Sequence, residues 1–396
     1  MEASSPIFLD HHSTTPCDEL VIEAMLPWMR EHFGNPHSSH AAGRQAADAI
    51  QHALQCVASL LNCNADQVVL TSGATESIAM ALAGVMRHPR QKKQTLLIGA
   101  TEHPATLDIA ETLGRDGYNI KRVRVHQSDS PMAGTIDLDA LESSIDDDTA
   151  LVSLMAANNE MGAIHPLDAV SKLCRDRGVL LHCDATQAIG RIGFDLAATP
   201  IDLVSFSAHK FYGPMGVGGL IVGAAGRRVR LRPLIVGGGQ QQGRRGGTVA
   251  VPLVVGLGRA AQLADQRQEL SQSEIHRLRD RLWSGLSSGM DGLTINGPPL
   301  GGQDRLPGNL NVKLPLVEGE ALLSAIGDEV AFSTGSACSS TEGKPSHALL
   351  AMGLSEAEAR QSIRLGIGRD TTYEEIESAT KQLIAGWQKL SLRGTS

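Results

Sequence analysis

The sequence predicts an α/β fold, in which a mostly parallel β-sheet is covered by helices on both faces. In the first half of the chain, short apolar runs alternate with stretches of helical periodicity. This is the pattern of strand–helix–strand units. Of the 396 residues, 42% are hydrophobic but only 3% are aromatic, so we expect an aliphatic core. Ligands of such sheets bind beyond the carboxyl ends of the strands.

Each predicted strand is a short apolar run between turn residues, and each predicted helix repeats apolar residues at helical spacing. In chain order, we expect strands at residues 67–71, 95–99, 120–125, 150–156, 179–183 and 203–207, and helices at residues 76–86, 106–114 and 166–176.

The pattern changes after residue 250. A long, mostly helical stretch runs to about residue 288, and residues 289–307 are rich in glycine and proline, as in a link between units. A strand at 309–314 and helices at 319–327 and 373–389 then predict a smaller α+β piece. We therefore expect a large domain of residues 15–260 and a small domain of residues 1–14 and 261–396.

Composition excludes several classes of protein. The net charge of −8 is spread along the chain, which disfavours a nucleic-acid-binding protein. The longest stretch without Asp, Glu, Lys or Arg is 211–226, too short and glycine-rich for a membrane span. No signal peptide is visible. Six cysteines without a CxxC pair do not indicate a disulfide framework, so a reducing cytoplasm is the expected location.

Two polar motifs follow predicted strands. In Ser205–Gly216, a strand runs into His209 and Lys210 and then into a turn rich in glycine. Such a lysine can form a Schiff base if burial lowers its pKa, although most lysines after a strand are simply exposed. Asp184 ends another apolar run. It could cap the following turn, or pair with the protonated pyridine nitrogen of pyridoxal phosphate (PLP).

Three other motifs bear on phosphate, nucleotide or metal binding. Residues 69–77 predict a strand, a glycine turn and a helix N-terminus, which could bind phosphate or could carry ordinary helix caps. The segment Gly256–Ala261 fits a loose dinucleotide fingerprint, but no strand and crossover unit follows it, so small residues for helix packing are the better interpretation. His182 and Cys183 have no third ligand at metal-site spacing, and no metal is expected.

Taken together, the motifs resemble those of the cysteine desulfurases, in the class V aminotransferase-like branch of fold type I PLP enzymes. The matching segments, in the family's order and at close to its spacing, are Phe8–Pro16, Thr71–Ser77, Asn158–Gly162, Asp184–Gln187, Ser207–Lys210 and Arg364–Arg369. The chain departs from the family pattern at His11 and His12, where an Asn pair is frequent. The resemblance implies the PLP-dependent transferase fold type I, with a large cofactor-binding domain and a smaller one.

The resemblance also implies roles for individual residues. Lys210 would hold PLP as a Schiff base and shuttle protons, Asp184 would face the pyridinium nitrogen, and His103 would stack on the ring. The cofactor phosphate would be bound by Ala74, Thr75, Ser207 and His209, and the ring hydroxyl by Gln187. Asn159 would contact the cofactor and, together with Arg364, the substrate carboxylate. Thr248 would reach the phosphate bound in a neighbouring subunit. The last contact implies a homodimer.

Cys338 separates this family from other PLP enzymes. It lies in a run of small, hydroxylated, Gly and Pro residues without apolar periodicity, which indicates an exposed loop. The run resembles the long catalytic loop of group I desulfurases. The implied reaction converts L-cysteine to L-alanine and leaves the sulfur as a persulfide on Cys338. The sulfur would then pass to an acceptor, such as a scaffold protein for iron–sulfur cluster assembly or another thio-cofactor pathway.

Two alternatives stay open at this point. The first is another PLP reaction on the same fold, such as that of an aminotransferase or a selenocysteine lyase. The second is a non-catalytic sulfur carrier or scaffold-binding protein. The Cys338 loop disfavours the first alternative, and the intact set of Lys210, Asp184 and His103 disfavours the second.

Overall fold

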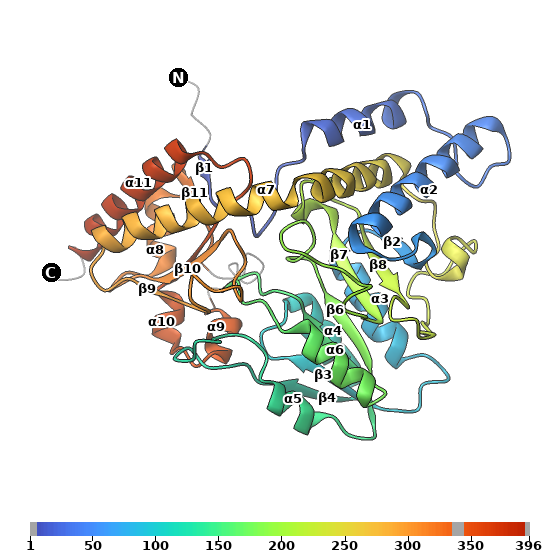
Figure 1. The fold of residues 1–396 in the computed structure, drawn as a ribbon, viewed down its shortest axis with the longest axis horizontal. Coiled ribbons are helices and arrows are strands. Elements are labelled where there is room, and N and C mark those ends of the chain that lie inside the picture. The colour runs from blue at the N-terminus through green and yellow to red at the C-terminus, as the bar shows by residue number, and fades with distance from the viewer. Residues whose placement is uncertain (1–5, 335–343, 393–396) are drawn as a thin grey trace.

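The computed structural model describes residues 6–334 and 344–392, apart from the side chains of residues 268–271. Figure 1 shows its two groups of elements, which share one long helix. The first group contains α1 (Glu19–Arg30), α2 (Ala41–Leu61), β2 (Val68–Thr71), α3 (Ala74–Met86), β3 (Thr95–Gly99), α4 (Pro104–Arg115), β4 (Asn119–Val123), α5 (Leu138–Ser144), β5 (Thr149–Met155), α6 (Leu167–Asp176), β6 (Leu180–Asp184), β7 (Leu203–Ser207) and β8 (Gly218–Val222), with short 3-10 turns η1 (Ala65–Gln67), η2 (Ala208–Lys210) and η3 (Gln241–Gly243).

The second group follows the long helix α7 (Val251–Gly289). It contains β9 (Thr294–Ile295), β10 (Asn309–Lys313), α8 (Gly319–Ile326), β11 (Val330–Ala331), α9 (His347–Ala351), α10 (Glu356–Arg360), β12 (Ser362–Gly366) and α11 (Tyr373–Ser391). The N-terminal strand β1 (Ile7–Phe8) joins this group, because it pairs in parallel with β11.

The large sheet has seven strands in the order β2-β8-β7-β6-β5-β3-β4. All neighbours run parallel except β8, which is antiparallel to both β2 and β7. The predicted α/β class and mostly parallel sheet are therefore confirmed. Because β5, β6 and β7 lie side by side and run in one direction, their carboxyl ends meet at one edge of the sheet, where a ligand is expected.

Aliphatic side chains from alternate strand positions cover the two faces of this sheet. In β3, for example, Leu97 belongs to the core shared with α1, α2, α6 and α7, whereas Leu96 and Ile98 pack with α3 and α4. The interior is thus built almost without aromatic residues. Phe206 and Phe211 are its only aromatic members on the first of these faces, among the described residues.

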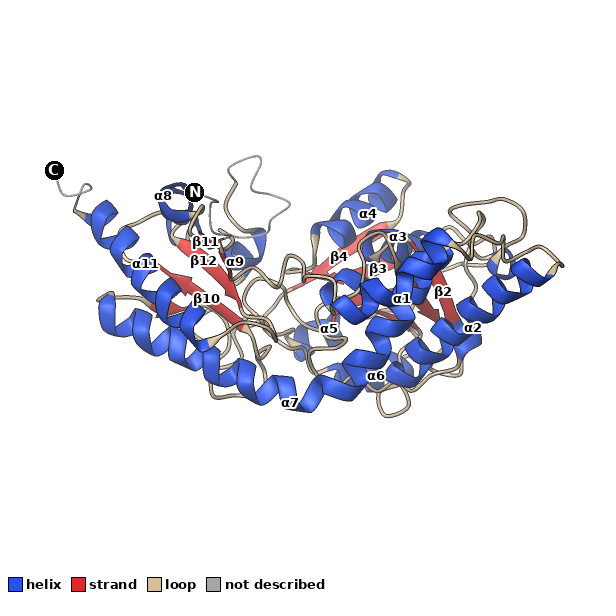
Figure 2. Cartoon of the chain, turned by 90° about the horizontal axis from the view of Figure 1, so that it is seen from above, coloured by secondary structure: helices blue, strands red, loops and turns tan. Residues whose placement is uncertain are grey.

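A second apolar core lies in the other group. It joins the C-terminal half of α7, the helices α8 and α11, and the antiparallel sheet β12-β10-β9. Figure 2 shows α7 passing along both groups. At 1.5 Å per residue its 39 residues span about 58 Å. The division into domains at residues 14/15 and 260/261 stays a prediction.

The expected strands and helices match the observed ones to within two residues at nearly every end. No sequence pattern predicted the helices α1, α2, α5, α9 and α10, the strands β8 and β12, or the two-residue strands β1, β9 and β11. β8 begins with two glycines in a stretch that looked like a turn. They are needed there because a Cβ on Gly218 would lie 2.8 Å from the Cα of Gly73, and one on Gly219 would lie 2.6 Å from the Phe206 ring.

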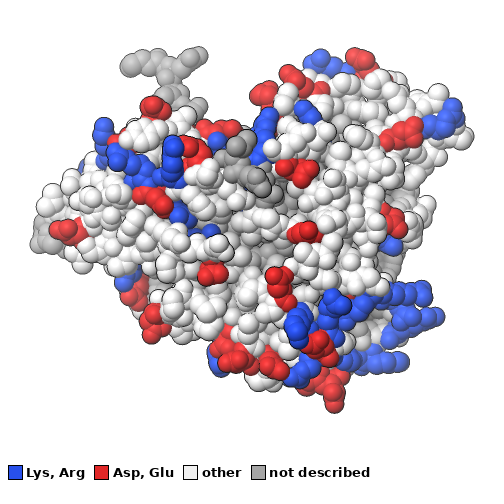
Figure 3. Space-filling model, viewed as in Figure 1, with Lys and Arg blue, Asp and Glu red and all other residues white. Residues whose placement is uncertain are grey.

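The described residues also bear on membrane spans, surface charge and metal binding. No helix in the described ranges is long and apolar enough to cross a bilayer. Figure 3 shows Lys and Arg mixed with Asp and Glu over most of one face, with one corner where basic side chains gather. Within 6–334 and 344–392, no cluster of His, Cys, Asp and Glu could hold a metal ion.

Candidate active site

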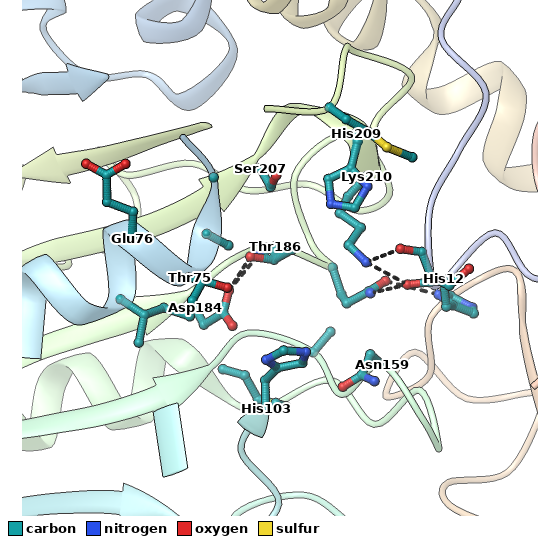
Figure 4. Close-up of a pocket in the computed structure, with 18 of the residues that line it drawn as sticks. His12, Thr75, Glu76, His103, Asn159, Asp184, Thr186, Ser207, His209 and Lys210 are labelled. Atoms are coloured by element: carbon teal, nitrogen blue, oxygen red, sulfur yellow. Dashed lines mark hydrogen bonds between the residues drawn. The ribbon is translucent and has the colours of Figure 1, made fainter. Parts of the chain in front are cut away.

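A cavity of about 420 Å³ lies at the carboxyl ends of β5, β6 and β7. Figure 4 shows side chains from distant parts of the chain pointing into it. The residues that the sequence analysis assigned to the site and that line this cavity are Ala74, Thr75, His103, Asn159, Asp184, Gln187, Ser207, His209, Lys210 and Arg364. The fold therefore brings together ten residues spread over almost three hundred positions.

Asp184 is the last residue of β6 and is buried. Its Oδ1 accepts hydrogen bonds from the Thr186 backbone N–H, at 3.0 Å, and from the Thr186 hydroxyl. No hydrogen bond between described residues uses Oδ2. The carboxylate is therefore held by one oxygen and can offer the other to a cationic group in the cavity.

Lys210 ends the 3-10 turn η2 that directly follows β7. Its Nζ donates to the backbone carbonyl of His12, at 3.1 Å, and to that of Ser13. Burial lowers the pKa of Lys210 to about 8, and the charges of Arg191 and Arg364 contribute to this shift. The amine is consequently easier to deprotonate than an exposed lysine, as a nucleophilic lysine requires.

His103 is the N-cap of α4, where its Nδ1 accepts a hydrogen bond of 3.1 Å from the backbone N–H of Ala105. Burial lowers its pKa below the ordinary value of 6.5. A neutral imidazole whose Nδ1 accepts must carry its proton on Nε2. The cap thus fixes the tautomer, and leaves an N–H on the ring atom that the helix does not use.

The N-terminus of α3 forms another wall. Its N-cap Gly73 has φ +152° and makes no side-chain cap, so the first N–H groups of the helix are not occupied by a capping oxygen. A Cβ on Gly73 would stand 3.4 Å from the Ser207 hydroxyl. Ala74, Thr75 and the Ser207 hydroxyl line the cavity here. Unpaired helical N–H groups with a hydroxyl beside them are suited to a phosphate.

Arg364, on β12, is 1% exposed. Its Nη2 donates to Asp10 Oδ1 at 2.7 Å and to Ser333 Oγ at 2.9 Å, and its Nη1 donates to the Asn159 carbonyl at 3.2 Å. Its Nε is buried and finds no partner among the described residues. Three of the five N–H groups of the guanidinium are thus used, and two have no partner among the described residues: the buried Nε–H and the second N–H of Nη1.

Gln187 is oriented by His12. The Gln187 Oε1 and the His12 Nδ1 are 3.1 Å apart, and the Gln187 Nε2 donates to the His12 carbonyl at 2.8 Å. Since Oε1 can only accept, the His12 proton is on Nδ1. His12, Ser13 and Asp10 contact predicted site residues, yet the sequence analysis gave them no role. Their membership of the matching segment 8–16 was the available signal.

Two predicted site residues, Thr248 and Cys338, are not among those that line the cavity in the described part of the chain. Thr248 is exposed and does not line this cavity, so its contact with a neighbouring subunit stays a prediction. Cys338 lies outside the described residues. Of the remaining cysteines, Cys174 and Cys183 are buried, whereas Cys17, Cys56 and Cys63 are partly exposed.

Comparison with known proteins identifies the family. Residues 7–378 match the model of the class V aminotransferases. This chain belongs to that family. It is 45% identical, over 386 residues, to a cysteine desulfurase IscS of Anaeromyxobacter sp. (strain Fw109-5), which covers 97% of this chain and 93% of that protein. A mouse cysteine desulfurase is 42% identical over 96% of this chain and 81% of its own length.

Solved structures agree with this membership. A NifS-like protein superposes with a TM-score of 0.88 at 35% identity, covering 98% of this chain and all of that one. SspA, solved in complex with cysteine, gives a TM-score of 0.78 at 30% identity over 91% of this chain. The family membership implies a PLP enzyme. The cavity fits that cofactor, because it combines an amine of lowered pKa, a carboxylate with a free oxygen and an uncapped helix N-terminus.

Proposed function

We propose that this chain is a PLP-dependent cysteine desulfurase, which converts L-cysteine to L-alanine and transfers the sulfur to Cys338. The observation that carries the proposal is the convergence of Lys210, Asp184 and His103 on one cavity beside the α3 N-terminus. Relatives that are 42–45% identical over nearly the whole chain carry the name cysteine desulfurase, which narrows the class of reaction.

Each wall of the cavity suits one part of the cofactor. Lys210 would hold PLP, and Asp184 would keep the ring nitrogen protonated. Residues Ala74, Thr75, Ser207 and His209 would hold the phosphate, and Gln187 would donate to the ring oxygen. When bound, PLP supplies an electron-withdrawing ring that labilises bonds at the substrate's α-carbon and weakens the carbon–sulfur bond.

The chain's own residues then bind the substrate and move protons. The second N–H of Arg364 Nη1, which no described residue accepts, and the Asn159 side chain would bind the substrate carboxylate. His103, neutral and with its proton on Nε2, would offer that N–H as a hydrogen-bond donor over the cavity. Lys210, whose pKa is lowered to about 8, can exist both as amine and as ammonium near neutral pH, as proton transfer requires.

Sulfur leaves the substrate through Cys338. The Cys338 thiolate attacks the substrate sulfur, so that a sulfur–sulfur bond forms while the substrate's carbon–sulfur bond breaks. The electron pair stays with the substrate carbon, which takes up a proton and ends as the methyl group of alanine. The persulfide passes its outer sulfur to a protein acceptor for iron–sulfur cluster or thio-cofactor assembly. We further propose a homodimer in which Thr248 reaches the partner's site, and a location in the reducing cytoplasm.

The test is a direct assay. The purified chain should be yellow, and with L-cysteine and a reductant it should release sulfide and alanine in equal amounts. Replacement of Cys338 by Ala should abolish sulfide release, whereas Cys17→Ala, at a partly exposed thiol, should leave it intact. Full activity of the Cys338 variant would overturn the nucleophile, and transamination without sulfide would overturn the reaction.

A further inference from the structure

Arg191 lies just behind Lys210 and contacts its backbone. Its Nη2 donates to the carbonyl of Lys210 at 3.1 Å and to that of His11 at 2.5 Å. Its Nε is sealed from solvent and finds no hydrogen-bond partner among the described residues. The residue therefore links the turn that carries Lys210 to the N-terminal segment whose carbonyls receive the Lys210 Nζ.

Arg191 differs from the neighbouring arginines in forming no ion pair with any residue that the structure describes. Arg364 pairs with Asp10 at 2.7 Å, and Arg369 pairs with Asp18. Within the described residues, Arg191 forms no ion pair and donates only to neutral carbonyls. A partly enclosed charge without a counterion is expensive, so it calls for an explanation beyond packing. Burial lowers the pKa of Arg191 to about 10. Since this value is still well above 7, the guanidinium is cationic near neutral pH.

Two carboxylates, those of Asp184 and Asp10, oppose the effect of the arginine charges on Lys210. Arg364 is matched by Asp10, which leaves the cation of Arg191 against the anion of Asp184. Asp184 already accepts two hydrogen bonds from Thr186. The neighbouring imidazoles, which are held neutral by burial that lowers their pKa, are His12, His103 and His209. After burial itself, Arg191 is the strongest influence lowering the pKa of Lys210.

We propose that Arg191 is a positioning residue that activates Lys210, holding its turn against the N-terminal segment and disfavouring the ammonium form through an unneutralised positive charge. A neutral amine is the form that can react with an aldehyde. The importance of this for catalysis rests on the proposed function, whereas the state of the amine is a property of this chain alone.

The test measures the Lys210 amine without cofactor or substrate. The full chain, freed of bound cofactor with hydroxylamine, is labelled with trace acetic anhydride at a series of pH values. Mass spectrometry of the Lys210 peptide then gives the titration midpoint of that amine, with exposed Lys92 as the internal standard. An unperturbed lysine titrates near about 10.4, and we expect Lys210 to titrate well below that value.

Arg191→Gln keeps hydrogen-bond donors and removes the charge, so it should raise the Lys210 midpoint by about one pH unit, a tenfold loss of neutral amine. Arg191→Lys should hold the midpoint near that of the wild type. Arg369→Gln is the matched control, because that arginine is nearby but paired, and it should leave the midpoint unchanged. An unchanged midpoint in folded Arg191→Gln would overturn the proposal.

If Arg191→Gln does not fold, Arg191→Met is measured in the same way. Failure of both neutral variants to fold would also overturn the proposal, because Arg191 would then serve stability alone. The two proposals can fail separately. If Arg191→Gln shifts the Lys210 midpoint as expected but the wild-type chain with PLP has no desulfurase activity, this inference stands and the proposed function is removed.

Discussion

The cavity has two walls that are built differently. The sheet wall, consisting of Asp184, Ser207 and Lys210, comes from the ends of two adjacent strands. The N-terminal wall, consisting of His12 and Arg364 together with Asp10, which pairs with Arg364, comes from a segment near the start of the chain and from β12. Strand pairing positions the first wall. In the second wall, Arg364 is held by the pairing of β12, and the N-terminal segment is joined to it by a β-bridge between Asp10 and Gly366 and by the Asp10–Arg364 ion pair.

This difference separates chemistry from alignment. Residues of the sheet wall offer a free carboxylate oxygen, an amine and a hydroxyl to the cavity, whereas residues of the N-terminal wall mostly contact one another and the sheet wall. Loss of a sheet-wall group should therefore affect the reaction first. Loss of Asp10 or His12 in the N-terminal wall should affect stability or orientation first.

The largest effect is expected at Lys210. Lys210→Ala removes the amine that would hold the cofactor, and we expect colourless protein and a fall in the rate of sulfide release of about 10³-fold or more. Lys172→Ala, at an exposed lysine, is the control and should keep both colour and rate. Visible absorbance and sulfide assay measure the two. A yellow and active Lys210→Ala variant would remove Lys210 from the reaction.

The next effect is on stability and arises in the N-terminal wall. Asp10→Asn leaves the guanidinium of Arg364, which is 1% exposed, without its counterion. Breaking a buried pair on one side destabilises by about 3 kcal/mol or more, which denaturant unfolding would detect. Asp176→Asn breaks the exposed pair with Lys172 and should change stability little. Equal effects of the two variants would show that the Asp10 pair is no stronger than a surface pair.

The two walls also differ in how far the sequence could predict them. Asp184 and Lys210 each end an apolar run or follow one directly, so their place at the carboxyl edge could be foreseen. The partnership of His12 with Gln187 joins residues 175 positions apart, and neither strand periodicity nor a local motif encodes such a contact. Arg191 was missed for the same reason, since its partners are backbone carbonyls that any residue could supply.

The fold shows a similar division. The alternating pattern of the parallel strands was visible, but β8 was missed because its glycines are selected by close contact with Gly73 and Phe206, and glycine lowers any strand signal. The helices α1 and α2 lay in a region for which no elements were proposed. The functions of Cys338 and Thr248 remain predictions from the resemblance.

A third prediction concerns the core directly behind the sheet wall. His182, fully buried, is 2.8 Å from Ser153 Oγ through Nδ1 and 2.9 Å from Ser205 Oγ through Nε2. Burial lowers its pKa from 6.5 to about 3. Between these two pH values, His182 binds a proton in the unfolded chain but not in the folded chain. The free energy of unfolding therefore falls as the pH drops below 6.5. The window extends down to about pH 3.

His182→Gln should remove this part of the pH dependence. Between pH 6 and pH 5, the free energy of unfolding of the wild type should fall by about 1 kcal/mol more than that of the variant. Both forms keep His165, another buried histidine whose pKa is lowered to about 4 by burial, so its contribution cancels. Parallel stability curves would mean that His182 is protonated in the folded protein.

The smallest effect is expected where the two walls meet. His12→Asn removes the imidazole that faces Gln187 Oε1 but keeps the backbone carbonyl that accepts from Gln187 and Lys210. One neutral hydrogen bond is worth about 0.5–1.5 kcal/mol, so PLP affinity should fall about threefold to tenfold, measured by titrating the colourless chain with PLP. In the double variant His12→Asn with Gln187→Leu, PLP affinity should fall further only by the contribution of the hydrogen bond from Gln187 to the cofactor ring. A much larger loss in His12→Asn alone would mean that the N-terminal wall holds the cofactor itself rather than orienting the residues that do.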